Sequence, residues 1–101
     1  MEFLTDMVTT VPEGTPEDVV SDTKTREAAR ARELVEQGHL LRLWKPPNLA
    51  GEWRTLGLFA ADDEHDLRHI LDSLPLHPWM KVDVVPLTPH PNDPGSEQAF
   101  G

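Results

Sequence analysis

Apolar and polar positions recur along most of the chain with two different spacings, which predict four strands and two helices. Alternation of apolar with polar residues is typical of a half-buried strand, whereas apolar residues at i, i+3, i+4 and i+7 are typical of an amphipathic helix. By these criteria the strands are expected at residues 2–11, 39–45, 53–59 and 80–87, and the helices at residues 16–37 and 62–74.

Residues that start and stop helices support these boundaries. Thr15 offers a hydroxyl cap and Pro16 a proline at the first helical position, while Gly38 is a C-terminal stop. The segment NLAGE at residues 48–52 is expected to be a turn. Three prolines and two glycines in residues 88–101 predict a tail without regular structure.

Two elements show which side chains share a face. In the second helix an apolar stripe at i, i+3, i+4 and i+7 comprises Leu67, Ile70, Leu71 and Leu74. In the third strand, alternation places Trp53, Thr55, Gly57 and Phe59 on one face and Arg54, Leu56 and Leu58 on the other.

The order of the elements, βαββαβ, predicts a ferredoxin-like α+β fold. Two helices would pack on one face of a four-stranded antiparallel sheet. Residues 1–87 would form this domain, followed by the Pro/Gly-rich tail at residues 88–101. Because such a single layer leaves the other face of the sheet open, a second subunit is expected to cover that face in a dimeric α/β-barrel type of assembly.

Composition and charge exclude several classes of function. The net charge of −9 opposes binding to nucleic acid, which needs clustered lysine and arginine, and to anionic lipid. With no cysteine the chain has no disulfide, thiolate nucleophile or cysteine zinc site. No stretch approaches the roughly 20 apolar residues of a membrane span. We therefore expect a cytoplasmic homo-oligomer that binds a small molecule, with no nucleic acid and no membrane as partner.

The first helix places two charged residues where an apolar stripe is expected. Advancing about 100° per residue from Val20, Lys24 and Glu27 fall in the same arc as Ala31 and Leu34. Burial of an unpaired charge costs several kcal/mol. Either the two side chains line a polar cavity between helix and sheet, or they form a structural ion pair at i, i+3, with the lysine reaching outward to solvent.

The cavity alternative has a chemical consequence. A carboxylate in such a cavity has a raised proton affinity and can act as a base near neutral pH. A neighbouring lysine can hold an anionic substrate or stabilise a developing oxyanion. Glu27 with Lys24 would therefore suit proton transfer next to a carbonyl group.

Several short stretches occur in an order that resembles the muconolactone delta-isomerase family. No single stretch is specific, and their order and spacing between about Met7 and Pro91 carry the resemblance. The stretches are K-x-x-E at Lys24 and Glu27, EQGxLxRLW at residues 36–44, LPLxPWM at residues 74–80 and HP at residues 90–91.

The resemblance implies a cofactor-independent isomerase that needs no metal. The family moves an allylic proton within an unsaturated lactone bearing a carboxymethyl arm, in aromatic degradation through the 3-oxoadipate pathway. It also implies homodimers that assemble further, in some members to a decamer. Glu27 is then expected to remove and return the proton, and Lys24 to bind a carboxylate or enolate oxygen.

The chain departs from the family pattern near the expected substrate carboxylate. Leu41 and Pro89 stand where the catabolic enzymes carry basic residues, and Arg42 replaces a histidine. The linker at residues 45–59 is longer than in those enzymes. Arg54 is expected to supply a replacement cation, so Arg42 and Arg54 are both candidate substrate-binding residues.

The segment LPLHPWM at residues 74–80 carries more bulk than a connection needs. Pro75 stops the second helix, and the rigid segment is expected to place Trp79 and Met80 at the rim of the cavity. An apolar wall there would exclude water and raise the basicity of a carboxylate. Alternatively, Trp79 closes the end of the core.

The tail carries a further candidate. His90 lies in the HP match and is expected near the substrate, with residues 88–94 packed over a neighbouring subunit's pocket and residues 95–101 mobile.

The remaining histidines and two of the tryptophans are expected to have simpler roles. His65 and His69 lie at i, i+4 but lack a third metal ligand, which favours a solvated face over a metal site. Trp44 and Trp53 flank the turn and are expected to pack in the core or at an interface, and His77 is expected in a loop.

A second class of function remains open, because this architecture hosts many functions. The alternative is a ferredoxin-like dimer that binds a small hydrophobic acid, or a cofactor-free monooxygenase. The feature that separates the two is the pair Lys24 and Glu27 on the inner arc. A binding protein needs a cation for its ligand but has no use for a buried base.

Overall fold

The four strands and two helices expected from the sequence are present, in the order β1, α1, β2, β3, α2, β4. The structure is a computed structural model that describes residues 1–47 and 53–95. A short 3-10 helix, η1, follows α2. The elements are β1 (Glu2–Thr9), α1 (Glu17–Glu36), β2 (Leu40–Trp44), β3 (Arg54–Ala60), α2 (Glu64–Asp72), η1 (His77–Trp79) and β4 (Met80–Leu87).

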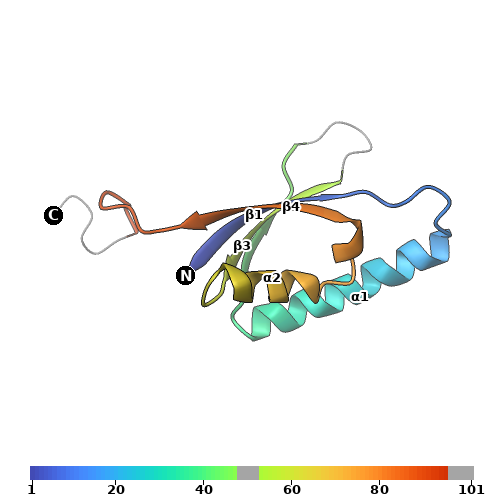
Figure 1. Cartoon of the computed structure of the whole chain (residues 1–101), viewed down its shortest axis with the longest axis horizontal. Coiled ribbons are helices and arrows are strands. Elements are labelled where there is room, and N and C mark those ends of the chain that lie inside the picture. The colour runs from blue at the N-terminus through green and yellow to red at the C-terminus, as the bar shows by residue number, and fades with distance from the viewer. Residues whose placement is uncertain (48–52, 96–101) are drawn as a thin grey trace.

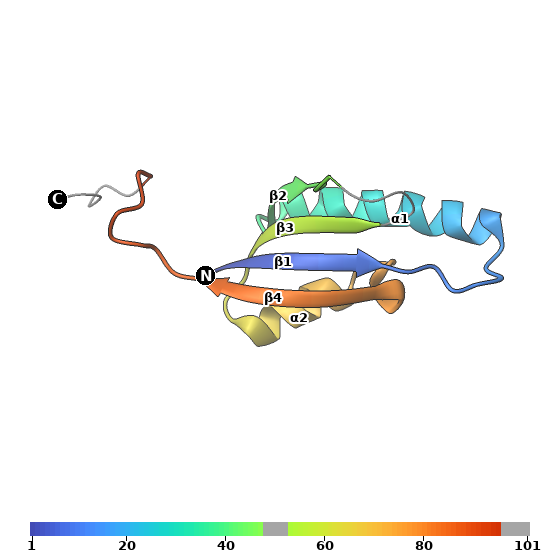
Figure 2. The same cartoon turned by 90° about the horizontal axis from the view of Figure 1, so that it is seen from above.

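The sheet has the strand order β2-β3-β1-β4, and every neighbouring pair is antiparallel. Both helices lie on the same face of this sheet (Figure 1). Seen from above, α1 lies beneath β2 and β3, and α2 lies beneath β1 and β4 (Figure 2). This arrangement confirms the predicted ferredoxin-like α+β fold.

The core lies between the sheet and the two helices. Burial alternates along β1, so that its odd-numbered residues face the helices. From α2 and the turn after it, the predicted stripe of Leu67, Ile70, Leu71 and Leu74 is buried throughout. The inward residues of β1 are Phe3, Thr5, Met7 and Thr9.

Close packing at the centre of the sheet requires a glycine in β3. A Cβ atom on Gly57 would lie 2.7 Å from Cε2 of Phe59 and 2.9 Å from Oγ1 of Thr5. Both distances are shorter than real Cβ contacts. The Thr5 hydroxyl donates to the Gly57 carbonyl at 3.2 Å, which ties β1 to β3 at this point.

Two details of the first helix differ from the expectation, and one expected turn is not described. The N-cap of α1 is Pro16, without a side-chain cap, and the Thr15 hydroxyl instead donates to the Pro12 carbonyl at 2.6 Å. Val35 near the end of α1, whose angle also falls close to the arc of Lys24 and Glu27, is 56% exposed. The predicted turn at residues 48–52 lies outside the described residues.

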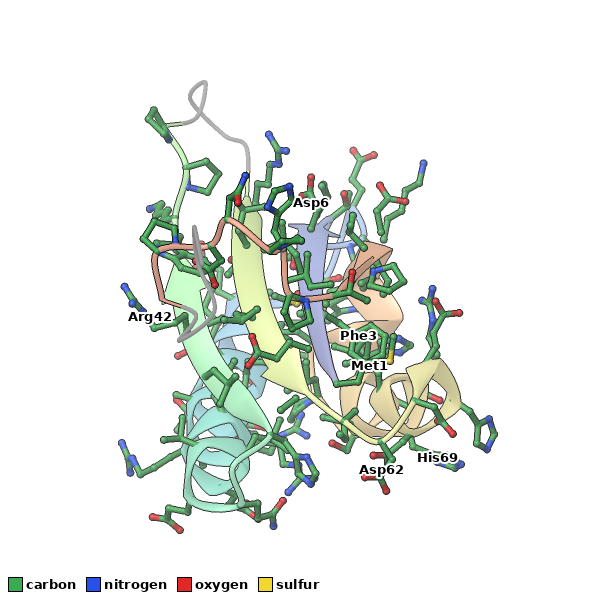
Figure 3. All side chains as sticks on the ribbon, turned by 90° about the vertical axis from the view of Figure 1, so that its left-hand side faces the viewer. Met1, Phe3, Asp6, Arg42, Asp62 and His69 are labelled. Atoms are coloured by element: carbon green, nitrogen blue, oxygen red, sulfur yellow. The ribbon has the colours of Figure 1, made fainter. Side chains whose placement is uncertain are left out.

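The second face of the sheet carries no helix. Alternation directs Leu4 and Val8 of β1 and Leu56 and Leu58 of β3 to this open face. Asp6 also projects from it, away from both helices (Figure 3). Within residues 1–47 and 53–95, no helix is long and apolar enough to cross a membrane.

Candidate active site

A cavity of about 320 Å³ lies between α1 and the covered face of the sheet. Its walls are mainly apolar, and every strand as well as α1 and the segment after α2 contributes to it. The lining residues are Met7, Thr9, Lys24, Glu27, Ala28, Ala31, Leu40, Leu43, Trp53, Thr55, Phe59, Leu74, Leu76 and Met80.

Glu27 is the carboxylate of this cavity, and it is half-buried. Its Oε1 accepts a hydrogen bond from the backbone N–H of Leu76 at 2.9 Å. Burial raises the pKa of Glu27, whereas the Leu76 N–H and the nearby His77 act in the opposite direction and lower it. The net direction is upward, which moves this carboxyl group toward the range of a base that works near neutral pH.

The segment LPLHPWM supplies that N–H group. After α2 the turn uses the His77 N–H for the Leu74 carbonyl and the Trp79 N–H for the Leu76 carbonyl, and Pro75 has no N–H. The Leu76 N–H therefore remains for Glu27. Because the Leu76 side chain is itself buried, the donor is fixed relative to α1. The turn that contains Pro75 and Pro78 thus directs one backbone N–H group toward the Glu27 carboxylate.

Lys24 also lines the cavity, one turn before Glu27. Its Nζ lies 4.9 Å from the centroid of the Trp53 ring. No ion pair joins Lys24 to Glu27 in the described part of the chain, so the structural ion pair that the sequence left open is not formed. Both charged groups instead face the cavity.

Trp53 and two threonines are cavity residues that sequence reasoning missed. Trp53 was expected only to pack in the core or at an interface. Thr9 and Thr55 add hydroxyl groups to the wall of the cavity. The alternation of β3 already placed Trp53, Thr55 and Phe59 on one face, and this signal would have found them once that face was assigned to α1.

The two arginines expected to bind the substrate, Arg42 and Arg54, do not line this cavity. Arg54 alternates with Thr55 and lies on the open face, where its guanidinium makes two bonds to the Asp6 carboxylate at 2.9 and 2.6 Å. Arg42 pairs with Leu58 on the same open face and stacks over Trp44 at 5.2 Å. Figure 3 shows Arg42 projecting outward from β2.

The two bulky residues of the LPLHPWM segment have different positions. Met80 lines the cavity, as expected for a residue at its rim. Trp79 is half-buried but is not part of the cavity wall. Its carbonyl accepts the Thr10 N–H at 2.8 Å, so it closes the end of the β1–β4 pair.

His90 lies far from the cavity of its own chain. β4 begins at the cavity with Met80 and ends at Leu87, about 24 Å away at 3.4 Å per residue. His90 follows that far end, where it lines a second pocket with Met1 and Asp93. Its Nδ1 accepts the Asn92 N–H at 2.9 Å.

The other histidines lie outside the cavity. The rings of His65 and His69 meet edge to face with centroids 5.1 Å apart on the exposed side of α2. His77 lies 3.3 Å from the Asp72 carboxylate. Among the described residues no cluster of three or more histidine, cysteine, aspartate or glutamate side chains could hold a metal ion.

The arrangement suits proton transfer on a small acid. An apolar wall limits water, a carboxylate with a raised pKa can take a proton, and an ammonium group one helical turn away can hold an anionic oxygen. A cavity of about 320 Å³ is at the small end of ligand pockets, which matches a compact ligand rather than a polymer.

Comparison with known proteins identifies the family of the chain. The family model of muconolactone delta-isomerase matches residues 1–93. The chain is 32% identical over 92 residues to the Muconolactone Delta-isomerase of Acinetobacter baylyi (strain ATCC 33305 / BD413 / ADP1), covering 91% of this chain and 93% of that protein. It is 33% identical to the Muconolactone Delta-isomerase of Cupriavidus pinatubonensis (strain JMP 134 / LMG 1197), covering 91% and 97%.

A solved structure is similar over the same range. The crystal structure of muconolactone isomerase at 3.3 Å resolution superposes with a TM-score of 0.82 at 27% sequence identity, over 96% of this chain and 98% of that one. The match of sequence and fold therefore extends over nearly the whole chain. The chain belongs to the muconolactone delta-isomerase family.

Proposed function

We propose that this protein is an isomerase that moves an allylic proton within an unsaturated lactone acid of the muconolactone type, in the 3-oxoadipate pathway, and that it needs no cofactor. The observation that carries the proposal is Glu27. It is the one carboxylate on the wall of the described cavity, its pKa is raised by burial, and a backbone N–H holds it in place.

The chemistry follows from the two charged groups. A proton on the ring carbon next to the double bond is acidic because the charge left behind is conjugated to the lactone carbonyl. The Glu27 carboxylate removes this proton and becomes neutral. The resulting dienolate takes the proton back from Glu27 at the other end of the conjugated system, so the double bond moves and no proton is gained or lost.

Lys24 supplies the positive charge for this reaction. Its ammonium group can hold the carboxylate of the substrate arm or stabilise the dienolate oxygen that forms in the transition state. With Arg42 and Arg54 on the open face, Lys24 is the basic residue that the described chain offers to the cavity. The hydroxyl groups of Thr9 and Thr55 are further donors for a lactone or carboxylate oxygen.

We further propose that a second copy of the chain covers the open face of the sheet. Large apolar side chains lie on this face, including Trp44 at 40% and Val85 at 52% exposure. Although the chain carries a net charge of −9, the charges on this face are balanced. The basic residues there are Arg42, Arg54 and Lys81, and the acidic residues are Glu2, Asp6 and Asp83.

The tail remains part of this proposal. If residues 1–87 form the domain, residues 88–94 leave the sheet at the end remote from the cavity of their own chain. His90 can then approach substrate only in a neighbouring subunit. Light scattering tests the assembly, and a particle of only 11.4 kDa at micromolar concentration would contradict it.

The activity is tested with an ultraviolet assay on a panel of substituted muconolactones. Turnover of one of them that falls in Glu27→Gln supports the proposed reaction. Tight binding of these lactones without turnover would instead favour a binding protein for small hydrophobic acids.

A further inference from the structure

Lys24 and Glu27 carry opposite charges one helical turn apart, yet they do not pair. Side chains at i, i+3 on a helix lie within reach of each other, and opposite charges there attract. Lys24 is exposed and Glu27 is half-buried beside an apolar cavity, so this attraction is only partly screened by water. The separation of the two groups therefore requires a cause.

Each group is held by a different partner. The Glu27 carboxylate accepts the Leu76 N–H at 2.9 Å, whereas the Lys24 ammonium lies 4.9 Å from the centroid of the Trp53 ring. A cation over an indole face is an electrostatic contact that gains strength where water is limited. The Trp53 backbone is itself fixed, because its carbonyl accepts the Thr9 N–H at 2.9 Å and so joins the β1–β3 pair.

We propose that Trp53 is a positioning residue whose ring holds the Lys24 ammonium away from the Glu27 carboxylate, so that cation and base both act on the substrate. This inference rests on the proposed isomerase function. Without the ring, the ammonium would move to the carboxylate one turn away. The base would then be neutralised by its neighbour, and the cation would no longer be available for an anionic oxygen.

Among the charged groups near Glu27, Lys24 is the one whose position depends on the Trp53 ring. From α1 the neighbouring charges are Lys24 at i−3 and Arg30 at i+3, and the Arg30 guanidinium is already bonded to Ser73 and Glu33. From η1 the neighbouring charge is His77, which already lowers the pKa of Glu27. The cavity residues contributed by the four strands carry no titratable side chain. A change in the pKa of Glu27 after substitution of Trp53 would therefore report the position of the Lys24 ammonium.

The test is a titration of the Glu27 carboxyl carbon by NMR in the substrate-free protein, with the signal assigned by its loss in Glu27→Gln. In Trp53→Leu the pKa of Glu27 is expected to fall by about one unit or more, as for a carboxylate that gains a cation within 4–6 Å. Trp53→Phe keeps a ring and should stay close to the parent. Trp44→Leu is the matched control, since it removes a similar ring–cation contact from the opposite face.

An unchanged Glu27 pKa in Trp53→Leu would overturn the proposal. The proposal would also be overturned if the pKa of Glu27 fell in Trp53→Leu and stayed low in the double variant Lys24→Met/Trp53→Leu. The Lys24 ammonium would then not be the cause of the lowered pKa. If circular dichroism shows that Trp53→Leu does not fold, Lys24→Met alone tests whether the two charges are separated in the parent protein. A Glu27 pKa close to the parent supports separated charges, and a rise of one unit or more shows that they already interact.

These measurements need no substrate, so they separate this inference from the proposed activity. If the titration contradicts the role of Trp53, the role of Glu27 is still tested separately by the isomerase assay. Conversely, a protein without isomerase activity could still show the titration behaviour. In an active enzyme, Trp53→Leu should also lower kcat and raise KM together, because both charged groups are displaced.

Discussion

Replacing Glu27 with glutamine removes the proposed base while it preserves the shape of the cavity wall. Glutamine has nearly the same volume, and its amide oxygen can still accept the Leu76 N–H that lies 2.9 Å from Oε1 in the native chain. What is lost is the ability to take a proton from the substrate. A positioned general base contributes about 10²–10⁴-fold to the rate. This range corresponds to about 3–5 kcal/mol of activation free energy.

The assay is the ultraviolet change on isomerisation of whichever lactone the parent enzyme converts. We expect kcat of Glu27→Gln to fall by about 10²–10⁴-fold, with circular dichroism unchanged. Glu36→Gln is the matched control, because it makes the same substitution at an exposed position of α1 outside the cavity. Turnover of the lactone by Glu27→Gln at the parent rate would refute the assignment of the base.

Glu27→Gln is expected to lower the rate but to gain stability relative to the parent as the pH rises, which gives a second test. Burial raises the pKa of Glu27 in the folded chain. A carboxyl group whose pKa is raised on folding contributes stability below its unfolded pKa, near 4.3. That contribution is lost as the pH rises through the folded pKa. The amide has no such loss, so the melting temperature of the variant relative to the parent should be higher at pH 8 than at pH 4. An equal difference at both values would contradict the raised pKa.

Three other predictions concern the fold and the assembly. Gly57→Ala should lower the free energy of unfolding by about 1–3 kcal/mol in urea denaturation, because its Cβ would meet Phe59 at 2.7 Å; an unchanged midpoint would show that the sheet adjusts freely. Asp6→Asn should destabilise the protein above about pH 4 and less below it, since Arg54 lowers the pKa of Asp6 and that stability is lost as the carboxylate is protonated; a pH-independent loss in thermal melts would argue against the ion pair. Deletion of residues 88–101 should weaken substrate binding and assembly together while circular dichroism stays the same, and unaltered kinetics and size would show that the tail has no role.

Local spacing was enough to predict the elements and the place of the two charged residues. The stripe of α2 and the alternation of β1 depend on periods that repeat within a few residues, so the burial of one face follows directly. Lys24 and Glu27 were placed on the inner arc of α1 by the same geometry. The chemistry of a carboxylate and an ammonium group in a cavity suggested proton transfer, and family resemblance added the reaction and the substrate class.

The positions of Arg42 and Arg54 show how far local spacing places a side chain. Alternation along β3 already set Arg54 on the face opposite Trp53 and Thr55. Since the cavity lies on the Thr55 side, Arg54 could not reach it. Arg42 was harder to place, because β2 has an irregularity in register between Leu40 and Arg42. That irregularity turns both Leu40 and Leu43 toward the cavity and Arg42 away from it.

Only the tertiary structure decided the partners of the two charged groups. Lys24 meets the ring of Trp53, and Glu27 meets the N–H of Leu76, across separations of 29 and 49 residues in the chain. Such contacts depend on the pairing register of β1 with β3 and on where the turn after α2 lands on α1. Register and helix docking are set by the packing of the whole core, in which every strand takes part, and no local pattern contains that information. The sequence by itself placed Lys24 and Glu27 on the inner arc of the first helix, and the fold decided that both line a cavity and that each is held by a different partner.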